Sequence, residues 1–225
     1  MSRSSRSVSS LFFIVLLVLA AVSFAKAVPA VAADDIRLSS ARDFLFAYQP
    51  QNPSEDSVLV TAQLFKDGRP IRQAGIPVNF SLTDGRFAKL DETTVFTDDL
   101  GMASTRVRSY NSGQEMTERP FLLGVTAMFG GKSSTVTMPI THYISLNGTI
   151  KDRSGGPVMN AQVGVLYNRT HNPINARGAT NTTDVYGNYR LDRVPTDLGD
   201  MVVYARKGDL ETYKPASFPQ GAGGT

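Results

Sequence analysis

Two short stretches of this chain share one pattern: Thr97-Asp98-Asp99-Leu100-Gly101 and Thr183-Asp184-Val185-Tyr186-Gly187. Each is followed by residues that alternate between apolar and polar, as in a strand with one buried face. In such a turn, an Asp side chain accepts hydrogen bonds from backbone amides just ahead of it, and a Gly adopts positive φ where the chain reverses. We expect two β-hairpin turns, held by four structural residues: Asp98, Gly101, Asp184 and Gly187.

The residues around the first turn predict a set of short strands. Apolar side chains alternate with polar ones at 58–64, 78–82, 103–107 and 136–140, so each stretch presents one face to a core. The run 121–129 is almost wholly apolar, which predicts a central strand covered on both faces. About seven short strands without a helix are typical of a β-sandwich.

A second set of strands follows, and its sequence repeats features of the first. Asp67, Pro70, Ala74 and Val78 recur in order as Asp152, Pro157, Ala161 and Val165, and the two turns lie 86 residues apart. An ordered set of matches at this distance indicates tandem related β-modules. Each module needs a second sheet to cover its inner face, so we expect an all-β fold of two tandem sandwiches.

The first 33 residues have the features of a signal peptide. Arg3 and Arg6 give a basic start, residues 11–24 are apolar, and Ala30-Val31-Ala32 offers small residues at the two positions that a signal peptidase reads. The alternative is an uncleaved anchor, because residues 8–25 are long enough to span a bilayer. The small residues after the apolar run favour cleavage.

Composition supports a folded, exported chain and excludes several classes of function. Hydrophobic residues make up 41% of the chain, which is enough to build cores. Three of the 23 basic residues precede residue 33, whereas all 20 acidic residues follow it, so the mature chain is formally neutral. It therefore lacks the basic excess of a nucleic-acid-binding protein. The absence of Cys excludes thiolate sites and favours a prokaryotic surface protein.

Residues of the first half occur in the order of a known pattern. They are Val60-Thr61-Ala62, Asp67-Gly68, Pro70, Gly75-Ile76-Pro77-Val78, Phe80, Gly85, Thr97-Asp98, Gly101, Ala103, Ser109, Gly113 and Val125-Thr126-Ala127. This set resembles the bacterial Ig-like domain of invasin- and intimin-type adhesins, over about residues 36–142. Two departures from the family pattern are the extra residues 69–73 and a long loop at 113–119.

Residues of the second half match another pattern. They are Leu146, Gly148, Ile150, Asp152, Gly156-Pro157-Val158, Asn160-Ala161, Val163, Thr183-Asp184, Gly187, Tyr189, Leu191 and Val194-Pro195. This set resembles the carboxypeptidase regulatory-like (transthyretin-like) domain, over about residues 143–210. Both resemblances imply small, non-catalytic β-sandwiches that act as spacers or interaction modules, and neither implies a named ligand.

These observations predict a domain order and a function. The expected order is a signal peptide at 1–33, an invasin-type Ig-like sandwich at 34–142, a carboxypeptidase regulatory-like sandwich at 143–212 and a linker or tail at 213–225. The expected protein is a secreted or cell-surface structural or adhesion protein, not an enzyme, that acts as a spacer and interaction module. The alternative is a carbohydrate-binding accessory module of a surface hydrolase. The expected partner is a surface protein or glycan, without nucleic acid, and with membrane contact only through the leader or an anchor outside this sequence.

Candidate catalytic and metal-ligating residues are few. His142 and His171 are the sole histidines; no Gly-x-Ser-x-Gly elbow accompanies them, and they are not spaced as a metal-binding pair. Asp98 and Asp99 could offer oxygens to calcium with a third carboxylate, but EF-hand spacing is absent and turn capping explains Asp98 without a metal. We therefore expect no catalytic residue, cofactor or metal site.

Four Asn-x-Ser/Thr sequons are candidate sites of N-linked glycosylation, which would make the protein a glycoprotein. Their asparagines are Asn79, Asn147, Asn168 and Asn181.

Aromatic residues offer one further candidate site. Phe44, Phe46 and Tyr48 occupy alternate positions, so they either stack against sugar rings or line one face of a strand against a core. Tyr186 and Tyr189 are expected to pack within the second hairpin.

Overall fold

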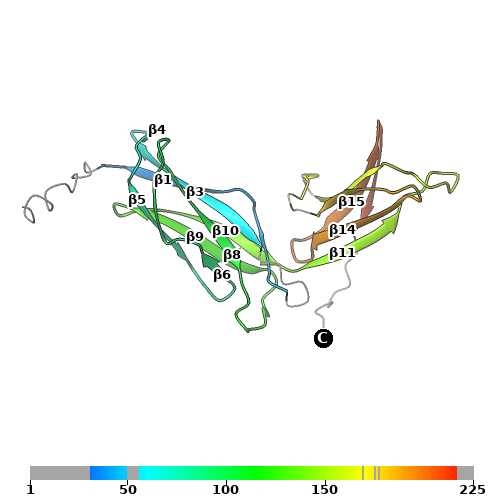
Figure 1. Ribbon diagram of the computed structural model, residues 1–225, viewed down its shortest axis with the longest axis horizontal. Coiled ribbons are helices and arrows are strands. Elements are labelled where there is room, and N and C mark those ends of the chain that lie inside the picture. Colours follow the sequence, from blue (N-terminus) through cyan, green and yellow to red (C-terminus); the bar gives the residue numbers. More distant parts are fainter. Residues whose placement is uncertain (1–30, 50–55, 169, 175, 177, 217–225) are drawn as a thin grey trace, which may run out of the picture. The chain divides into compact units, whose positions relative to one another are not determined.

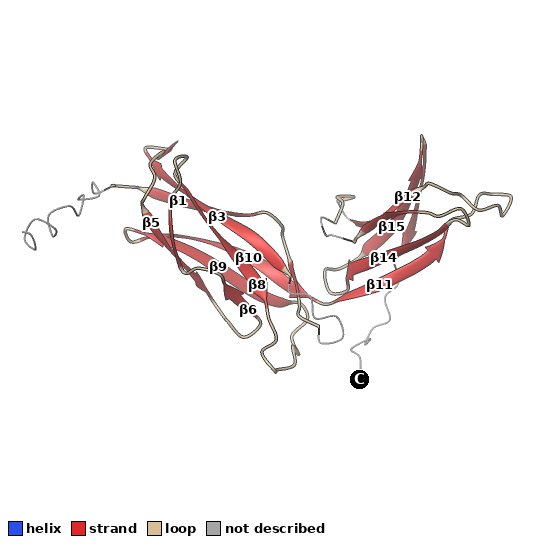
Figure 2. Ribbon diagram, viewed as in Figure 1, coloured by secondary structure: helices blue, strands red, loops and turns tan. Residues whose placement is uncertain are grey.

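The computed structural model describes residues 31–49, 56–168, 170–174, 176 and 178–216. All regular secondary structure in these residues is β-strand, which confirms the all-β prediction (Figure 2). Accordingly, the described residues contain no helix of the length and apolarity needed to cross a membrane. The predicted signal peptide lies almost wholly outside the described residues.

The first sandwich consists, within the described residues, of two five-stranded sheets (Figure 1). One has the order β1-β3-β8-β6, with β4 paired to β3: β1 (Asp35–Ser40), β3 (Ser57–Lys66), β4 (Arg69–Pro70), β6 (Ala88–Leu90) and β8 (Met102–Ser109). The other has the order β2-β10-β9-β5-β7: β2 (Leu45–Phe46), β5 (Pro77–Leu82), β7 (Thr94–Phe96), β9 (Phe121–Phe129) and β10 (Lys132–Thr141).

Alternation along the strands builds the core of this sandwich. In β3, Val58, Val60, Ala62 and Leu64 are buried, as the pattern of the sequence predicted. In β9 the prediction of a strand covered on both faces is wrong. Leu122 and Met128 are exposed on its outer face. Leu122 pairs with Pro139, and Met128 pairs with Ser133 and Asn79 on the neighbouring strands.

The second sandwich consists, in the part of the chain that is described, of a two-stranded and a four-stranded sheet. The first pairs β11 (Tyr143–Thr149) with β14 (Asn188–Pro195). The second has the order β13-β12-β15-β16: β12 (Gln162–Tyr167), β13 (Thr180–Thr182), β15 (Met201–Lys207) and β16 (Leu210–Pro215). Strand β16 was not predicted, because its residues do not form an apolar face; all six are exposed.

The core of the second sandwich includes two side chains from the other half of the sequence. Phe44 and Phe46, at 0% and 1% exposure, belong to the same buried cluster as Val163, Leu191 and Met201. Between them, Leu45 pairs through the backbone with Ile140 of β10, in the first sandwich. One short segment therefore contributes to both sandwiches, which the division of the chain at residue 142 does not anticipate.

Two glycines of the second sandwich each lie beneath a tyrosine of the neighbouring strand. Gly148 pairs with Tyr189, and Gly164 pairs with Tyr204. A Cβ atom added at Gly148 would lie 2.5 Å from the Tyr189 hydroxyl oxygen, and one added at Gly164 would lie 2.6 Å from Cε1 of Tyr204. Each ring thus fills the space that a side chain at the glycine would otherwise occupy.

We predict that Gly164→Ala lowers the free energy of unfolding by about 2 kcal/mol, because the added methyl displaces the Tyr204 ring. The measurement is urea unfolding followed by circular dichroism. Gly85→Ala is the matched control, since the nearest atom to its Cβ is the Ala88 carbonyl oxygen at 3.7 Å. Equal stability of the two variants would contradict this account of the glycine.

Candidate functional site

The prediction that the two turns of the shared pattern close β-hairpins is wrong, because each turn joins strands of two different sheets. Strand β7 pairs with β5 but β8 pairs with β3 and β6, and β13 pairs with β12 but β14 pairs with β11.

The two turns do make the same backbone contacts. In the first, Asp98 Oδ1 accepts hydrogen bonds from the amides of Leu100 and Met102, both at 2.9 Å. In the second, Asp184 Oδ1 accepts from Tyr186 and Asn188 at 2.9 and 2.8 Å. Each aspartate therefore closes its own turn through a single carboxylate oxygen.

A buried threonine in each turn forms hydrogen bonds with the backbone just before an inner strand, which is β5 in the first sandwich and β12 in the second. Thr97 Oγ1 accepts from the Ile76 amide at 3.0 Å and donates to the Gln73 carbonyl at 2.6 Å. Thr183 Oγ1 accepts from the Ala161 amide at 2.8 Å and donates to the Val158 carbonyl at 2.7 Å. The two threonines are 4% and 2% exposed, so both hydroxyls bond the backbone away from competing water.

The glycine of each turn is required by space as well as by conformation. Gly101 has φ of +75°, and a Cβ there would lie 1.6 Å from the Ile71 carbonyl oxygen. Gly187 has φ of +77°, and its Cβ would lie 2.5 Å from the Ile150 carbonyl oxygen. Only a glycine allows the turn to approach the neighbouring backbone this closely.

The middle residues of the turns face solvent. Leu100 is 53% exposed, Val185 is 65% exposed and Tyr186 is 71% exposed. The expectation that Tyr186 packs within a hairpin is therefore wrong, because its turn joins strands of two different sheets and leaves this side chain facing solvent. Tyr189, which lies in β14, packs over Gly148 as described above.

A buried ion pair lies where the two sandwiches meet. Asp56, with a side chain 10% exposed, pairs with Arg42, at 12%, and accepts the Phe46 amide at 2.9 Å. Its other carboxylate oxygen lies 4.0 Å from Arg193 Nη1, in β14 of the second sandwich. Arg42 also donates to the Phe44 carbonyl at 2.8 Å, so the carboxylate and two arginines hold the segment that carries both phenylalanines.

The aromatic row of the sequence lies inside this junction. Phe46 packs edge-on against Phe44 and Tyr143, with ring centroids 5.1 and 5.0 Å away. Tyr48 is half-buried. The row therefore cannot form a sugar-stacking surface, because its two phenylalanines are buried in the second core.

The linker between the sandwiches is fixed by one carboxylate. Asp197 Oδ2 accepts from the His142 backbone amide at 3.0 Å, and it lies 3.3 Å from both His142 Nδ1 and Thr141 Oγ1. His142 thus has a role in positioning the linker. His171, the other candidate, packs its ring edge-on against Tyr213 at 5.8 Å.

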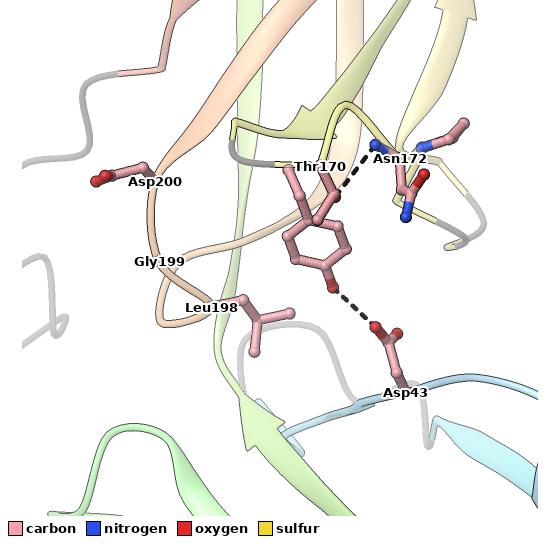
Figure 3. Close-up of a pocket in the computed structure, with 8 residues that line it drawn as sticks. Asp43, Thr170, Asn172, Leu198, Gly199 and Asp200 are labelled. Carbon is pink, nitrogen blue, oxygen red and sulfur yellow. Dashed lines mark hydrogen bonds between the residues drawn. The ribbon is translucent and has the colours of Figure 1, made fainter.

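A pocket of about 820 Å³ opens beside the junction (Figure 3). It is lined by Asp43, Tyr167, Thr170, Asn172, Pro173, Leu198, Gly199 and Asp200. The Tyr167 hydroxyl donates to Asp43 Oδ2 at 3.4 Å. Burial, followed by the charge of Asp43 and this hydrogen bond, raises the pKa of Tyr167 above its usual value, so the phenol stays protonated.

The sequon asparagines Asn79, Asn147, Asn168 and Asn181 are all exposed. Asn79 Oδ1 accepts from Thr94 Oγ1 at 2.8 Å, and Asn181 Nδ2 donates to the Arg190 carbonyl at 2.7 Å. Glycosylation of these residues stays a prediction. In the described residues, no three His, Cys, Asp or Glu side chains gather as they would around a metal ion.

Comparisons with known proteins give likenesses among solved structures alone. No family model matches the chain, and a search of curated proteins returns no match. The D0-D1 domain of intimin is similar over 81% of this chain and 96% of that one, with 20% identity and a TM-score of 0.36.

The adhesin InvE of Yersinia pseudotuberculosis is similar over 80% of this chain, with 16% identity and a TM-score of 0.35. The Escherichia coli adhesin FdeC is similar over 84%, with 14% identity and a TM-score of 0.36. The chain spans 58% of the InvE structure and 66% of the FdeC structure. At such TM-scores, function has to be argued from the residues of this chain.

We predict that Thr97→Val and Thr183→Val each lower the free energy of unfolding by about 2 kcal/mol. Either change removes two hydrogen bonds and leaves a backbone amide without its partner. Chemical unfolding of the two variants is the measurement. Thr182→Val, at an exposed position beside Thr183, is the control and is expected to stay within about 0.5 kcal/mol of the parent. A loss of stability in only one of the two variants would show that the two turns are not equivalent.

We predict that Asp56→Asn lowers the free energy of unfolding by about 3 kcal/mol, because it leaves Arg42 buried without an anion. Asp35→Asn is the matched control. Asp35 pairs with Arg37 at the surface, where the Arg37 side chain is 63% exposed and that of Asp35 is 49% exposed. Loss of this pair is expected to lower the free energy of unfolding by less than about 1 kcal/mol. Thermal unfolding of both variants measures the difference, and similar midpoints would argue against a structural role for the buried pair.

Proposed function

We propose that this chain is a non-catalytic structural or adhesion protein outside a prokaryotic cell, in which two sandwiches in series act as a spacer and as an interaction module. The sequence resemblance to invasin- and intimin-type domains supports this proposal, as does the all-β fold. The division into a leader at 1–33, sandwiches at 34–142 and 143–212 and a tail at 213–225 belongs to the same proposal.

The observation that carries the spacer role is the set of contacts at the junction. A spacer holds a fixed distance only if its modules do not move freely relative to each other. Modules that are joined by few contacts are expected to move. Here the segment of Phe44 and Phe46 enters the second core, Asp56 lies near Arg193, and Asp197 binds the linker at His142. These contacts limit bending between the two sandwiches.

The contacts of the candidate residues support a role without catalysis. Asp98 and Asp184 are engaged by the amides of their own turns, and the Asp197 carboxylate positions His142 within the linker. Each of these groups stabilises backbone geometry. The residues left facing solvent at the turns, such as Leu100 and Tyr186, supply contact surface for a partner.

Surface labelling of intact cells tests the location. A membrane-impermeant amine reagent is expected to modify Lys89 and Lys132 of the protein on unbroken cells, since both lie at exposed positions. A cytosolic protein of the same cells is the control and is expected to react only after lysis. Labelling of this chain only after lysis would overturn the proposal.

Loss of cell attachment on deleting the gene, with recovery on restoring it, is expected for the adhesion role.

A further inference from the structure

The two-stranded sheet of the second sandwich has one open border. Strand β14 lies along one side of β11, and no other described strand pairs with the opposite side of β11 (Figure 2). The far side of β14 is covered, because the Asp192 amide donates to the Gly178 carbonyl at 3.0 Å. The open border of this sheet therefore runs along β11.

The register of β11 with β14 shows which backbone groups point to this border. In an antiparallel pair, every second residue directs both its N–H and its C=O toward the neighbouring strand. The Ile150 amide donates to the Gly187 carbonyl at 2.8 Å, so Ile150 and every second residue before it bond toward β14. The residues between them, Ser145, Asn147 and Thr149, direct their backbone groups to the border. We name residues 145–149 the open stretch.

The open stretch is bounded at both ends. At its start, Gln49 Nε2 donates to the Tyr143 carbonyl at 2.9 Å and engages the backbone there. Just beyond its end, Lys151 forms an isolated bridge with Pro157, where the chain leaves the border of the sheet. Asn147 is therefore the middle residue of the stretch that is open to a further strand.

Other border strands of the described residues are protected against pairing, whereas β11 is not. Charges, prolines and shortness are the usual protection of a free strand edge. Strand β16 carries Glu211, Lys214 and Pro215, and β1 carries Asp35 and Arg37. Strands β2, β4, β6, β7 and β13 have only two or three residues each. Strand β11 has seven residues, none of them charged and none a proline.

Apolar side chains beside the open border are incompletely covered. Ile144, Leu146 and Ile150 pack against the core of the second sandwich, yet each is only partly buried. A strand added along β11 would remove more of their apolar surface from water, which stabilises the added strand in its place. The border thus offers both backbone partners and apolar contact.

The side chains of the open stretch suit a second copy of the same strand. A contact between identical surfaces is related by a twofold axis, so each residue meets its counterpart in reverse order. Antiparallel pairing centred on Asn147 places Asn147 opposite its own copy and Ser145 opposite Thr149 of the second copy. On the core face, Leu146 lies opposite Gly148 of the second copy. No charges oppose each other in this register, and hydroxyl and amide groups face one another across the strands.

The tail of this chain is a poorer occupant of the border. Four of the nine residues in 217–225 are Gly or Pro, and both residue types weaken a strand.

We propose that two copies of this chain pair along β11, which joins their two-stranded sheets into one four-stranded sheet of order β14-β11-β11-β14. The backbone groups of Ser145, Asn147 and Thr149 bond those of the second copy. So short a contact buries less than the roughly 800 Å² per partner of a stable interface, so the dimer is weak and forms where copies are concentrated. The inference names a partner for the interaction module proposed above, and it rests on that function for its location outside the cell.

Sedimentation equilibrium of the full chain tests the pairing. The parent is expected to show a monomer–dimer equilibrium at sub-millimolar concentration. Asn147→Lys and Asn147→Asp each place like charges opposite each other at the axis, so each is expected to weaken dimerisation about tenfold. An equimolar mixture of these two variants is expected to restore the dimer, because opposite charges then meet. Asn147→Gln is the matched control: it also removes the sequon but adds no charge, and it is expected to dimerise as the parent does.

A single thiol tests the register. The chain contains no Cys, so Asn147→Cys introduces the only one. Mild oxidation is expected to link two copies, because residues opposite each other in a bonded antiparallel pair have Cα atoms about 5.5 Å apart, which a disulfide spans. Thr212→Cys, at an exposed position of β16, is the control and is expected to stay monomeric under the same conditions.

Four results would overturn the proposal. They are a folded parent that stays monomeric, a dimer of Asn147→Lys as strong as that of the parent, a mixture of the two charged variants that dimerises no better than either alone, and a dimer that appears only when residues 217–225 are removed. The last would assign the border to the tail. Since every substituted variant keeps residues 1–33, association through the leader would survive Asn147→Lys. Unchanged thermal midpoints would show that the variants remain folded.

The surface labelling described above separates this inference from the proposed function. Labelling on intact cells with a monomeric chain rejects the pairing alone, whereas a dimer with labelling only after lysis rejects the location alone.

Discussion

A buried threonine hydroxyl, bonded to the backbone on two sides, is the contact on which both sandwiches depend. Thr97 binds Gln73 and Ile76, immediately before β5 begins, and Thr183 binds Val158 and Ala161, immediately before β12 begins. The hydroxyl therefore fixes where each inner strand enters its sheet. A slip of one residue would turn every side chain of a strand to the other face. In each sandwich, the threonine hydroxyl therefore helps to keep the inner strand in the register that builds the core.

Much of this arrangement could be predicted from the sequence, because its causes are local. An Asp that caps its own turn, a Gly at positive φ and a period of two in hydrophobicity all act within a few residues. The backbone contacts of Asp98 and Asp184 show how directly such a pattern leads to geometry. The hydroxyl bonds of Thr97 and Thr183 were harder to foresee, since their partners lie more than 20 residues earlier.

Other features depend on what lies across from a residue, which alternation does not reveal. Phe44 and Phe46 were expected to face either sugars or a core, but nothing local shows that the core belongs to the other half of the chain. The apolar run of β9 suggested two covered faces, yet Leu122 remains exposed because none of the described segments covers the outer side of that sheet. Tyr186 was assigned to hairpin packing because nothing local shows that the strands on either side of its turn, β13 and β14, belong to different sheets. The sequence alone does not reveal the ion pair of Asp56 with Arg42, because it depends on the burial of the two side chains in the folded chain.

The segment that joins the two cores has a consequence for how the chain comes to be folded. Phe44 and Phe46 are synthesised more than 90 residues before Val163 and Leu191, against which they finally pack. Until β12 and β14 have emerged, the growing polypeptide presents two aromatic rings that have no place to bury, a stage at which sticky surface invites association with other chains. Export of an unfinished or truncated product would leave that surface permanently uncovered.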